Sequence, residues 1–136
     1  MDALEKLNEK MPPFAKHIGI KLTAANKDRV LARIEVRPEL CTIPAIAHGG
    51  VVMAFADTLG AAATILNLPE GAWTSTIESK TNFVAPAAEG IVIIGETTPI
   101  HRGRRTMIWQ MRVTTEEGKL LALVTQTQIV LEGQAG

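Results

Sequence analysis

The longest apolar segment of the chain runs from His48 to Leu66 and has the composition of a buried helix. It begins with the pair Gly49–Gly50, and nearly every later position is small or aliphatic, which is typical of a helix covered on all sides. The exception is Asp57, because a lone carboxylate is costly to bury unless it is paired, hydrogen-bonded or protonated. Asp57 therefore either faces a gap or a partner chain, or acts as a catalytic acid.

Shorter segments on both sides of this helix alternate between apolar and polar residues, as half-buried strands do. Two of them flank the turn sequence Asn26–Lys27–Asp28 and predict a hairpin before the helix. A short amphipathic helix is predicted over residues 2–11, and Pro12–Pro13 ends it. The predicted strands cover residues 17–23, 30–36, 74–84, 91–98, 105–115 and 120–131.

Strands before and after one apolar helix favour a sheet that curves around the helix. The predicted fold class is therefore α+β, with six antiparallel strands and one long central helix. The chain has 136 residues, which is enough for one domain with its own core. We expect a single domain over residues 1–136, with the core over residues 14–131.

Composition narrows the classes of partner. The chain has 14 Lys and Arg and 14 Asp and Glu, so its formal net charge of zero gives no indication of nucleic-acid or membrane-surface binding. Cys41 is the single cysteine, which excludes an intrachain disulfide and a thiolate metal cluster and fits a cytoplasmic protein. The segment Met1–Lys6 mixes charges and lacks the apolar region of a signal peptide, and charges interrupt every candidate membrane span.

The sequence His48–Gly49–Gly50 at the helix start predicts an electrophile-activating site. Glycines leave the backbone amides uncovered, and the first N–H groups of a helix have no internal acceptor. Together with the helix dipole, they suit an anion or a carbonyl oxygen that becomes negative in a transition state. The alternative is an ordinary loop-to-helix turn in which His48 only caps the helix.

The spacing between the two candidate groups indicates a site shared by two chains. Gly50 and Asp57 are seven residues apart, so they lie on one helix face and roughly 10 Å apart along the axis. One carbonyl can hardly contact both groups of the same helix. Two antiparallel copies of the helix would bring Gly50 of one chain beside Asp57 of the other.

A third candidate is the basic segment Ile100–Arg105, which contains Arg102, Arg104 and Arg105 around a glycine. Guanidinium groups bind phosphates through paired hydrogen bonds, so this segment is either a phosphate site or a solvated hairpin tip. The three histidines lack the spacing of metal ligands, and we expect no metal site and no cofactor.

The order of the elements, the turn Ala47–His48–Gly49–Gly50 and the acid nine residues after the histidine resemble the hotdog-fold acyl-CoA thioesterases. The branch is the one that contains the Arthrobacter-type 4-hydroxybenzoyl-CoA thioesterases and the phenylacetate-pathway thioesterases. The segment Asn82–Pro86 is similar to the strand of that family that ends in Phe-x-x-Pro. The resemblance implies a six-stranded antiparallel sheet wrapped around a long central helix, with homodimers or homotetramers built as dimers of dimers.

The resemblance also implies roles for the site residues. Asp57 would act on the thioester as nucleophile or general base, the Gly50 N–H would polarise the carbonyl, and His48 would orient the substrate. The acyl-CoA would have further contacts, and the arginines would hold its phosphates. These expected substrate and coenzyme A contacts are Gly49, Thr42, Thr58, Thr76, Asn82, Arg102, Arg104 and Arg105.

Three positions depart from the pattern of the family. Many relatives have Asn or Gln at the position of Thr42, Gly at that of Ala45, and Ser or Thr at that of Ala61. A non-catalytic acyl-CoA-binding hotdog protein is therefore the alternative to an acyl-CoA thioesterase. A hydratase or dehydratase is a third possibility, but enzymes of that kind place their His and Asp differently.

Overall fold

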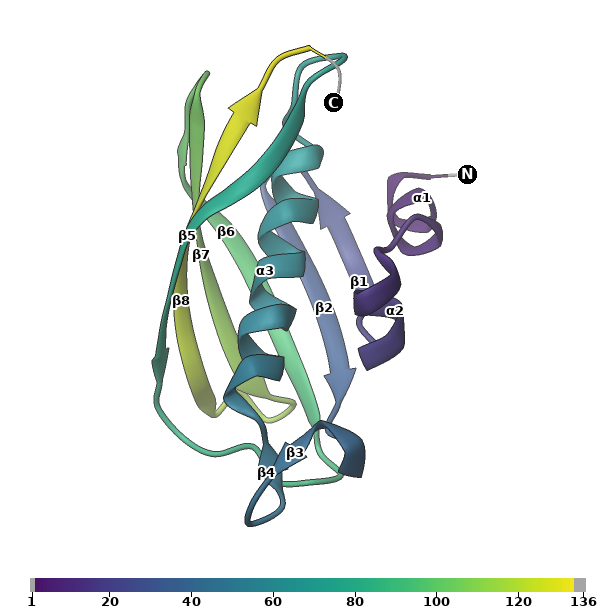
Figure 1. Cartoon of the computed structure of the whole chain (residues 1–136), viewed down its shortest axis with the longest axis vertical. Coiled ribbons are helices and arrows are strands. Elements are labelled where there is room, and N and C mark those ends of the chain that lie inside the picture. Colours follow the sequence, from purple (N-terminus) through teal and green to yellow (C-terminus); the bar gives the residue numbers. More distant parts are fainter. Residues whose placement is uncertain (1, 134–136) are drawn as a thin grey trace.

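The computed structural model describes residues 2–133 and consists of an antiparallel sheet that wraps around one long helix, α3 (Figure 1). Two short helices precede the first strand, and a small two-stranded ribbon precedes α3. The elements are α1 (Ala3–Glu9), α2 (Pro13–Ile18), β1 (Lys21–Asn26), β2 (Arg29–Glu35), β3 (Cys41–Thr42), β4 (Ile46–Ala47), α3 (Gly49–Ile65), β5 (Trp73–Phe83), β6 (Val92–Arg102), β7 (Thr106–Thr115) and β8 (Leu120–Leu131).

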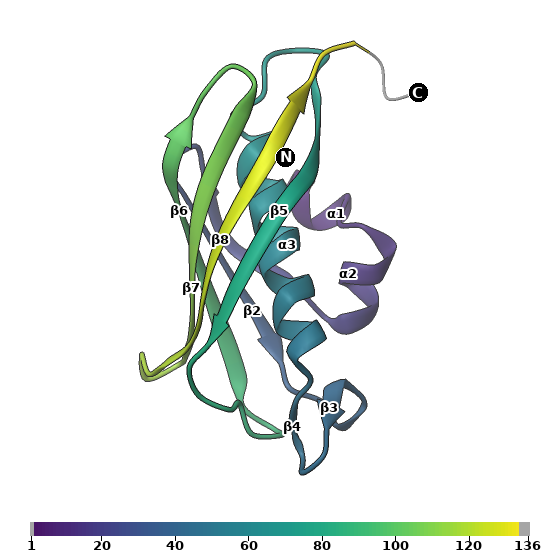
Figure 2. The same ribbon diagram turned by 60° about the vertical axis from the view of Figure 1, so that its left-hand side comes forward.

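The main sheet has six strands in the order β1-β2-β6-β7-β8-β5, and every neighbouring pair is antiparallel. The strands that follow α3 therefore lie on one side of the hairpin β1–β2, and β5 is an edge strand. Figure 2 shows the sheet curving around α3, with α1 and α2 beside the helix. The predicted fold class, with six antiparallel strands and a central helix, is confirmed.

The helix α3 packs onto the concave face of the sheet through Phe55 and Leu59, which are almost fully buried. Gly95 of β6 makes this close approach possible, because a Cβ at that position would lie 2.7 Å from the Phe55 ring. Burial of two large side chains of this kind contributes about 1.5–3 kcal/mol each. The opposite face of α3 is partly open, and Met53, Asp57 and Ile65 are exposed on the helix.

The strand predicted over residues 17–23 is wrong in its first half. His17 and Ile18 end helix α2, Gly19 follows in the left-handed region with φ of +89°, and the strand begins only at Lys21. The alternating apolar residues of this segment are all buried, but they belong to two elements separated by a glycine turn. Alternation over so short a segment reports burial and cannot distinguish a helix end from a strand.

The basic segment also differs from its predicted form. β6 extends to Arg102 with a bulge between Pro99 and His101, so the connection to β7 is shorter than expected. Arg104 and Arg105 lie in this short connection, whereas Arg102 belongs to the strand. The predicted turn at residues 26–28 is confirmed, because the Asn26 side chain accepts hydrogen bonds from the following backbone.

Candidate active site

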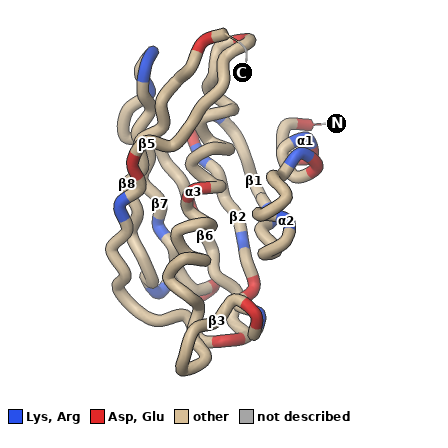
Figure 3. Tube along the Cα trace, viewed as in Figure 1, with Lys and Arg blue, Asp and Glu red and all other residues tan. Residues whose placement is uncertain are grey.

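Asp57 lies at the middle of α3, where Figure 3 shows an acidic segment within the helix. Its Oδ1 accepts two hydrogen bonds, from Thr76 Oγ1 of β5 at 2.6 Å and from Gln126 Nε2 of β8 at 3.0 Å. The expectation that α3 is covered on all sides is wrong for this chain, since Asp57 and Met53 are both exposed. The carboxylate is held from the sheet side and is open on the other.

An apolar cavity of about 640 Å³ opens beside Asp57, between α3 and the two N-terminal helices. Its walls combine small residues of α3, such as Ala54 and Ala61, with apolar side chains of α1 and α2. Thr58 also lines it, although its hydroxyl donates to the Ala54 carbonyl at 2.8 Å. A cavity of this size and character can hold an apolar group next to a carboxylate.

His48 is the N-cap of α3, and its Nδ1 accepts a hydrogen bond from the Gly50 N–H at 2.8 Å. A Cβ at position 50 would lie 2.9 Å from Nδ1, so a larger residue there would require the histidine ring to shift. The amide predicted to polarise a carbonyl is therefore engaged by the neighbouring histidine. Sequence reasoning named both residues but did not predict this bond between them.

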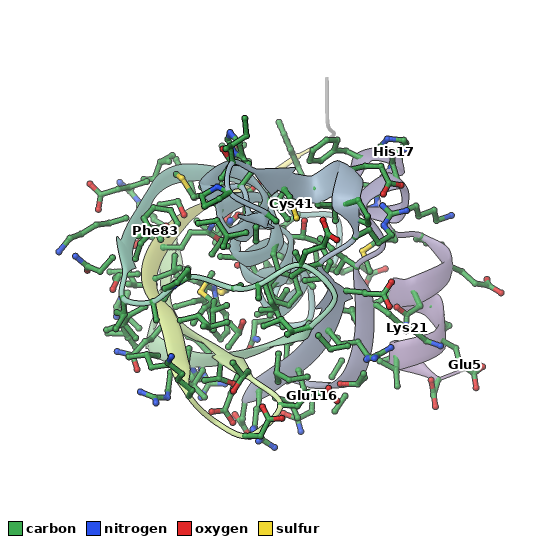
Figure 4. The ribbon with its side chains drawn as sticks, turned by 90° about the horizontal axis from the view of Figure 1, so that it is seen from below. Glu5, His17, Lys21, Cys41, Phe83 and Glu116 are labelled. Atoms are coloured by element: carbon green, nitrogen blue, oxygen red, sulfur yellow. The ribbon has the colours of Figure 1, made fainter. Side chains whose placement is uncertain are left out.

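A second apolar cavity, of about 400 Å³, lies at the start of α3. Gly49 and Thr42 line it together with Phe83, whose ring would be 3.2 Å from a Cβ at position 49. Figure 4 shows this end of the molecule and labels Cys41 and Phe83. Asn82 is exposed on the edge strand β5 and does not line either of these two cavities.

The two candidate groups of the helix do not meet within one chain. Gly49 lines the cavity at the helix start and Asp57 lines the cavity beside the N-terminal helices. Gly50 and Asp57 are both exposed, and their seven-residue spacing places them on the same face of the helix. A single chain therefore presents a carboxylate at one place and the helix N-terminus at another.

The three arginines are also separated from the helix start. Figures 1 and 3 place the β6–β7 connection at the end of the molecule opposite β3 and β4. Arg102 pairs with Asp28 at 2.8 Å and donates to the Lys27 carbonyl, so its guanidinium is engaged. Arg104 and Arg105 line an open cleft of about 570 Å³ with residues at the end of β8.

Neither the cysteine nor the metal-ligating side chains of the described residues point to a different chemistry at the site. The pKa of the Cys41 thiol is raised, first by desolvation and then by Glu89 and Glu39, which disfavours a thiolate nucleophile. Among residues 2–133, no group of three or more metal-ligating side chains comes together. Within the same range, no helix is long and apolar enough to cross a membrane.

Sequence reasoning missed Gln126 and Gln128 of β8. Both side chains are completely buried, and Gln126 contacts Asp57 directly. The sequence did carry a signal. Side chains alternate between the two faces of a strand, and the two glutamines occupy the core-facing positions that follow Ala122 and Val124 in β8. Buried primary amides in such positions call for a hydrogen-bonding partner in the core.

Comparison with known proteins identifies the family and supports the fold. The model of the thioesterase superfamily matches residues 45–122, which is more than half of the chain. The crystal structure of a Haemophilus influenzae thioesterase superimposes with a TM-score of 0.90 and 31% identity, covering 97% of this chain and 92% of the other.

Two further relatives extend the comparison. The proofreading thioesterase EntH of Cronobacter turicensis is 28% identical over 117 residues, which are 85% of each chain. The Streptococcus mutans protein smu.793, whose crystal structure has acetyl-CoA bound, shares the fold with a TM-score of 0.78 at 21% identity, over 86% of this chain and 92% of its own. The family match and the fold together place this chain in the thioesterase superfamily.

Proposed function

We propose that this chain hydrolyses the thioester bond of an acyl-CoA with an apolar or aromatic acyl group, using Asp57 as nucleophile or general base. Membership of the thioesterase superfamily makes the chain a thioester hydrolase. The observation that supports the finer proposal is the position of Asp57, whose Oδ1 is held by two donors on the wall of an apolar cavity. A carboxylate so placed can act on a carbonyl bound in that cavity.

Thioester hydrolysis requires a nucleophile and a group that stabilises the developing oxyanion. As a nucleophile, Asp57 would attack the carbonyl carbon through Oδ2, forming a mixed anhydride as the thiolate leaves, and water would then hydrolyse the anhydride. As a general base, Asp57 would take a proton from a water molecule that attacks the same carbon. Both routes give the free acid and coenzyme A.

We propose that the oxyanion donor comes from a second copy of the chain. Within one chain Gly50 and Asp57 are too far apart to contact one carbonyl. An antiparallel pair of α3 helices about a two-fold axis would place the helix start of one chain beside Asp57 of the other. The Gly50 N–H would then reach a substrate oxygen only when His48 Nδ1 gives up its present hydrogen bond.

The remaining parts of an acyl-CoA can be placed in this arrangement. The cavity beside Asp57 would take the acyl group, and the bound acetyl-CoA of the Streptococcus mutans neighbour supports a coenzyme A ligand. Arg104 and Arg105 would hold the phosphates, whereas Arg102 is engaged by Asp28. Thr42 and Gly49 are candidate contacts at the helix start, and Asn82 is a candidate contact on the edge strand β5.

The test is a thiol-release screen over short, medium, long and aromatic acyl-CoAs with wild type and Asp57→Asn. The variant keeps the shape of the side chain and removes its charge, so we expect the fold to survive and activity to fall by about two or more orders of magnitude. Glu70→Gln, at an exposed acid beyond α3, is the matched control. Near wild-type turnover by Asp57→Asn would remove Asp57 from the mechanism, and tight acyl-CoA binding without thiol release would indicate a binding protein.

A further inference from the structure

A buried polar chain connects the sheet to the carboxylate of Asp57. The core-facing side of β8 is apolar at Ala122 and Val124 and then carries Gln126 and Gln128, which are 0% exposed. A buried primary amide is stable only when its donors and acceptor are all engaged. The partners of these two amides therefore show what the amides do.

Every polar group of Gln128 has a partner. Its Nε2 donates to Thr76 Oγ1 at 2.6 Å and to Gln126 Oε1 at 2.7 Å. Its Oε1 accepts from Thr74 Oγ1 at 2.9 Å. The Nε2 of Gln126 donates in turn to Asp57 Oδ1 at 3.0 Å and to Ser79 Oγ at 3.3 Å.

The direction of these hydrogen bonds is determined by the carboxylate at their end. An ionised carboxylate only accepts, so both the Thr76 hydroxyl and the Gln126 amide have to donate toward Asp57. Thr76 has one hydroxyl proton, and it is directed to Asp57 because Gln128 donates to the same oxygen. A reversed Gln126 would set Oε1 against Asp57 Oδ1, so Gln128 also fixes the orientation of that amide.

The helix is adapted to this chain of hydrogen bonds. Gly60 lies in the interior of α3, where glycine is unfavourable, and a Cβ at this position would overlap Gln126 Oε1 and lie 2.7 Å from its Cδ. The glycine therefore gives the Gln126 amide access to Asp57. Among residues 2–133 the salt bridges are Arg29–Glu96 and Arg102–Asp28, so neutral donors alone hold the carboxylate.

We propose that Gln126 and Gln128 are positioning residues for the reaction, and that Gln128 acts through Thr76 and Gln126 without touching the substrate. This inference rests on the proposed function of Asp57. Both donors converge on Oδ1, which fixes the plane of the carboxylate and leaves Oδ2 for the substrate. The amides thus select the oxygen that reacts.

The primary test is Gln128→Met, which keeps the length of the side chain and removes its donors. Without Gln128, the donors Thr76 and Gln126 are no longer held toward the Asp57 carboxylate. We therefore expect kcat to fall about tenfold to a hundredfold, the range for loss of a hydrogen bond to a charged group, with KM changed by less than about threefold. The matched control is Thr64→Val, which removes a fully buried hydroxyl of α3 that accepts from Trp109 Nε1 at 2.8 Å. Its kcat should stay at the wild-type value.

Two comparisons separate positioning from a general loss of structure. Thr76→Ser keeps the hydroxyl and should lose much less of the wild-type kcat than Thr76→Val, which removes the donor to Asp57. In an Asp57→Asn background, Gln128→Met should cause no further loss, since its effect passes through the carboxylate. The proposal is wrong if Gln128→Met keeps the wild-type kcat, if its loss persists in the Asp57→Asn background, or if Thr64→Val causes an equal loss.

A spectroscopic measurement keeps this test independent of the proposed function. The side-chain amide protons of Gln126 should exchange slowly in the wild type, and Gln128→Met should accelerate their exchange while Thr64→Val should not. If the wild type releases no thiol from any acyl-CoA, the proposed function fails while these signals still report the hydrogen bonds to Asp57. Exchange as fast as that of an exposed glutamine in the wild type would overturn the positioning role itself.

Discussion

Replacing Gly60 with alanine should destabilise the protein, although the same change normally stabilises a helix. In a helix interior, alanine is favoured over glycine by about 1 kcal/mol. At this position, however, the new Cβ would overlap Gln126 Oε1, and the far end of Met111 would lie 3.1 Å from it. The methionine can move, but the glutamine amide is hydrogen-bonded on both sides and completely buried.

The size of the effect follows from the hydrogen bonds that the displaced amide gives up. Moving Gln126 breaks its bonds to Asp57 and Gln128, and a buried group left without a partner costs about 1–3 kcal/mol. Two such losses amount to roughly 2–6 kcal/mol, and the higher helix propensity of alanine offsets about 1 kcal/mol of this cost. The free energy of unfolding should therefore fall by about 1–5 kcal/mol, a large part of the stability of a typical domain.

Urea unfolding followed by tryptophan fluorescence measures this change, because Trp109 is completely buried. The informative control is the same substitution in a Gln126→Ala background, where the space beside the helix is free. There Gly60→Ala should stabilise the protein by up to about 1 kcal/mol, so the effect changes sign. A Gly60→Ala variant at least as stable as the wild type, with Gln126 intact, would refute the packing argument.

Three further predictions concern the substrate and the assembly. Replacing Arg104 and Arg105 with Gln should raise KM for acyl-CoA and weaken its salt dependence, and an equal loss with a phosphate-free acyl-pantetheine would contradict the phosphate assignment. Ala61→Leu narrows the cavity beside Asp57 and should lower kcat/KM for long acyl groups about tenfold more than for acetyl-CoA, whereas an unchanged chain-length profile would place the acyl group elsewhere. Mixed dimers of Asp57→Asn and Gly50→Pro parents, each folded, dimeric and inactive, should regain one working site, and inactive verified heterodimers would exclude a shared site.

Most of the fold could be predicted from the sequence because its signals are long and periodic. The central helix and the strands after it each extend over ten or more residues, and their patterns left few alternatives. The failure over residues 17–23 came from a short segment in which Ile18 and Ile20 are buried for different reasons. Only the backbone turn at Gly19 separates a helix end from a strand there.

The residues of the candidate site likewise fall into those that the sequence could indicate and those that it could not. Asp57 and the glycine pair could be named because their signal is local, within one helix. Gln126 could not be assigned to Asp57, because the two are 69 residues apart and meet only through the position of β8 beside α3. The open face of α3 was mispredicted because a composition suited to burial does not show which faces of a helix are covered within one chain.

The exposed face of α3 explains both the composition of the helix and the direction from which Asp57 is held. Met53 and Ile65 of α3 are 40% and 51% exposed, and Ile77 of the edge strand β5 is 57% exposed. A second chain that covered the open face of α3 would complete the burial that the sequence indicates and would supply the missing helix N-terminus. The carboxylate of Asp57 then has to be fixed from the sheet side, because any support from the open side would occupy the space that the thioester needs. Gln126 and Thr76 lie on the sheet side and both bind Oδ1, which is the arrangement that this reasoning requires.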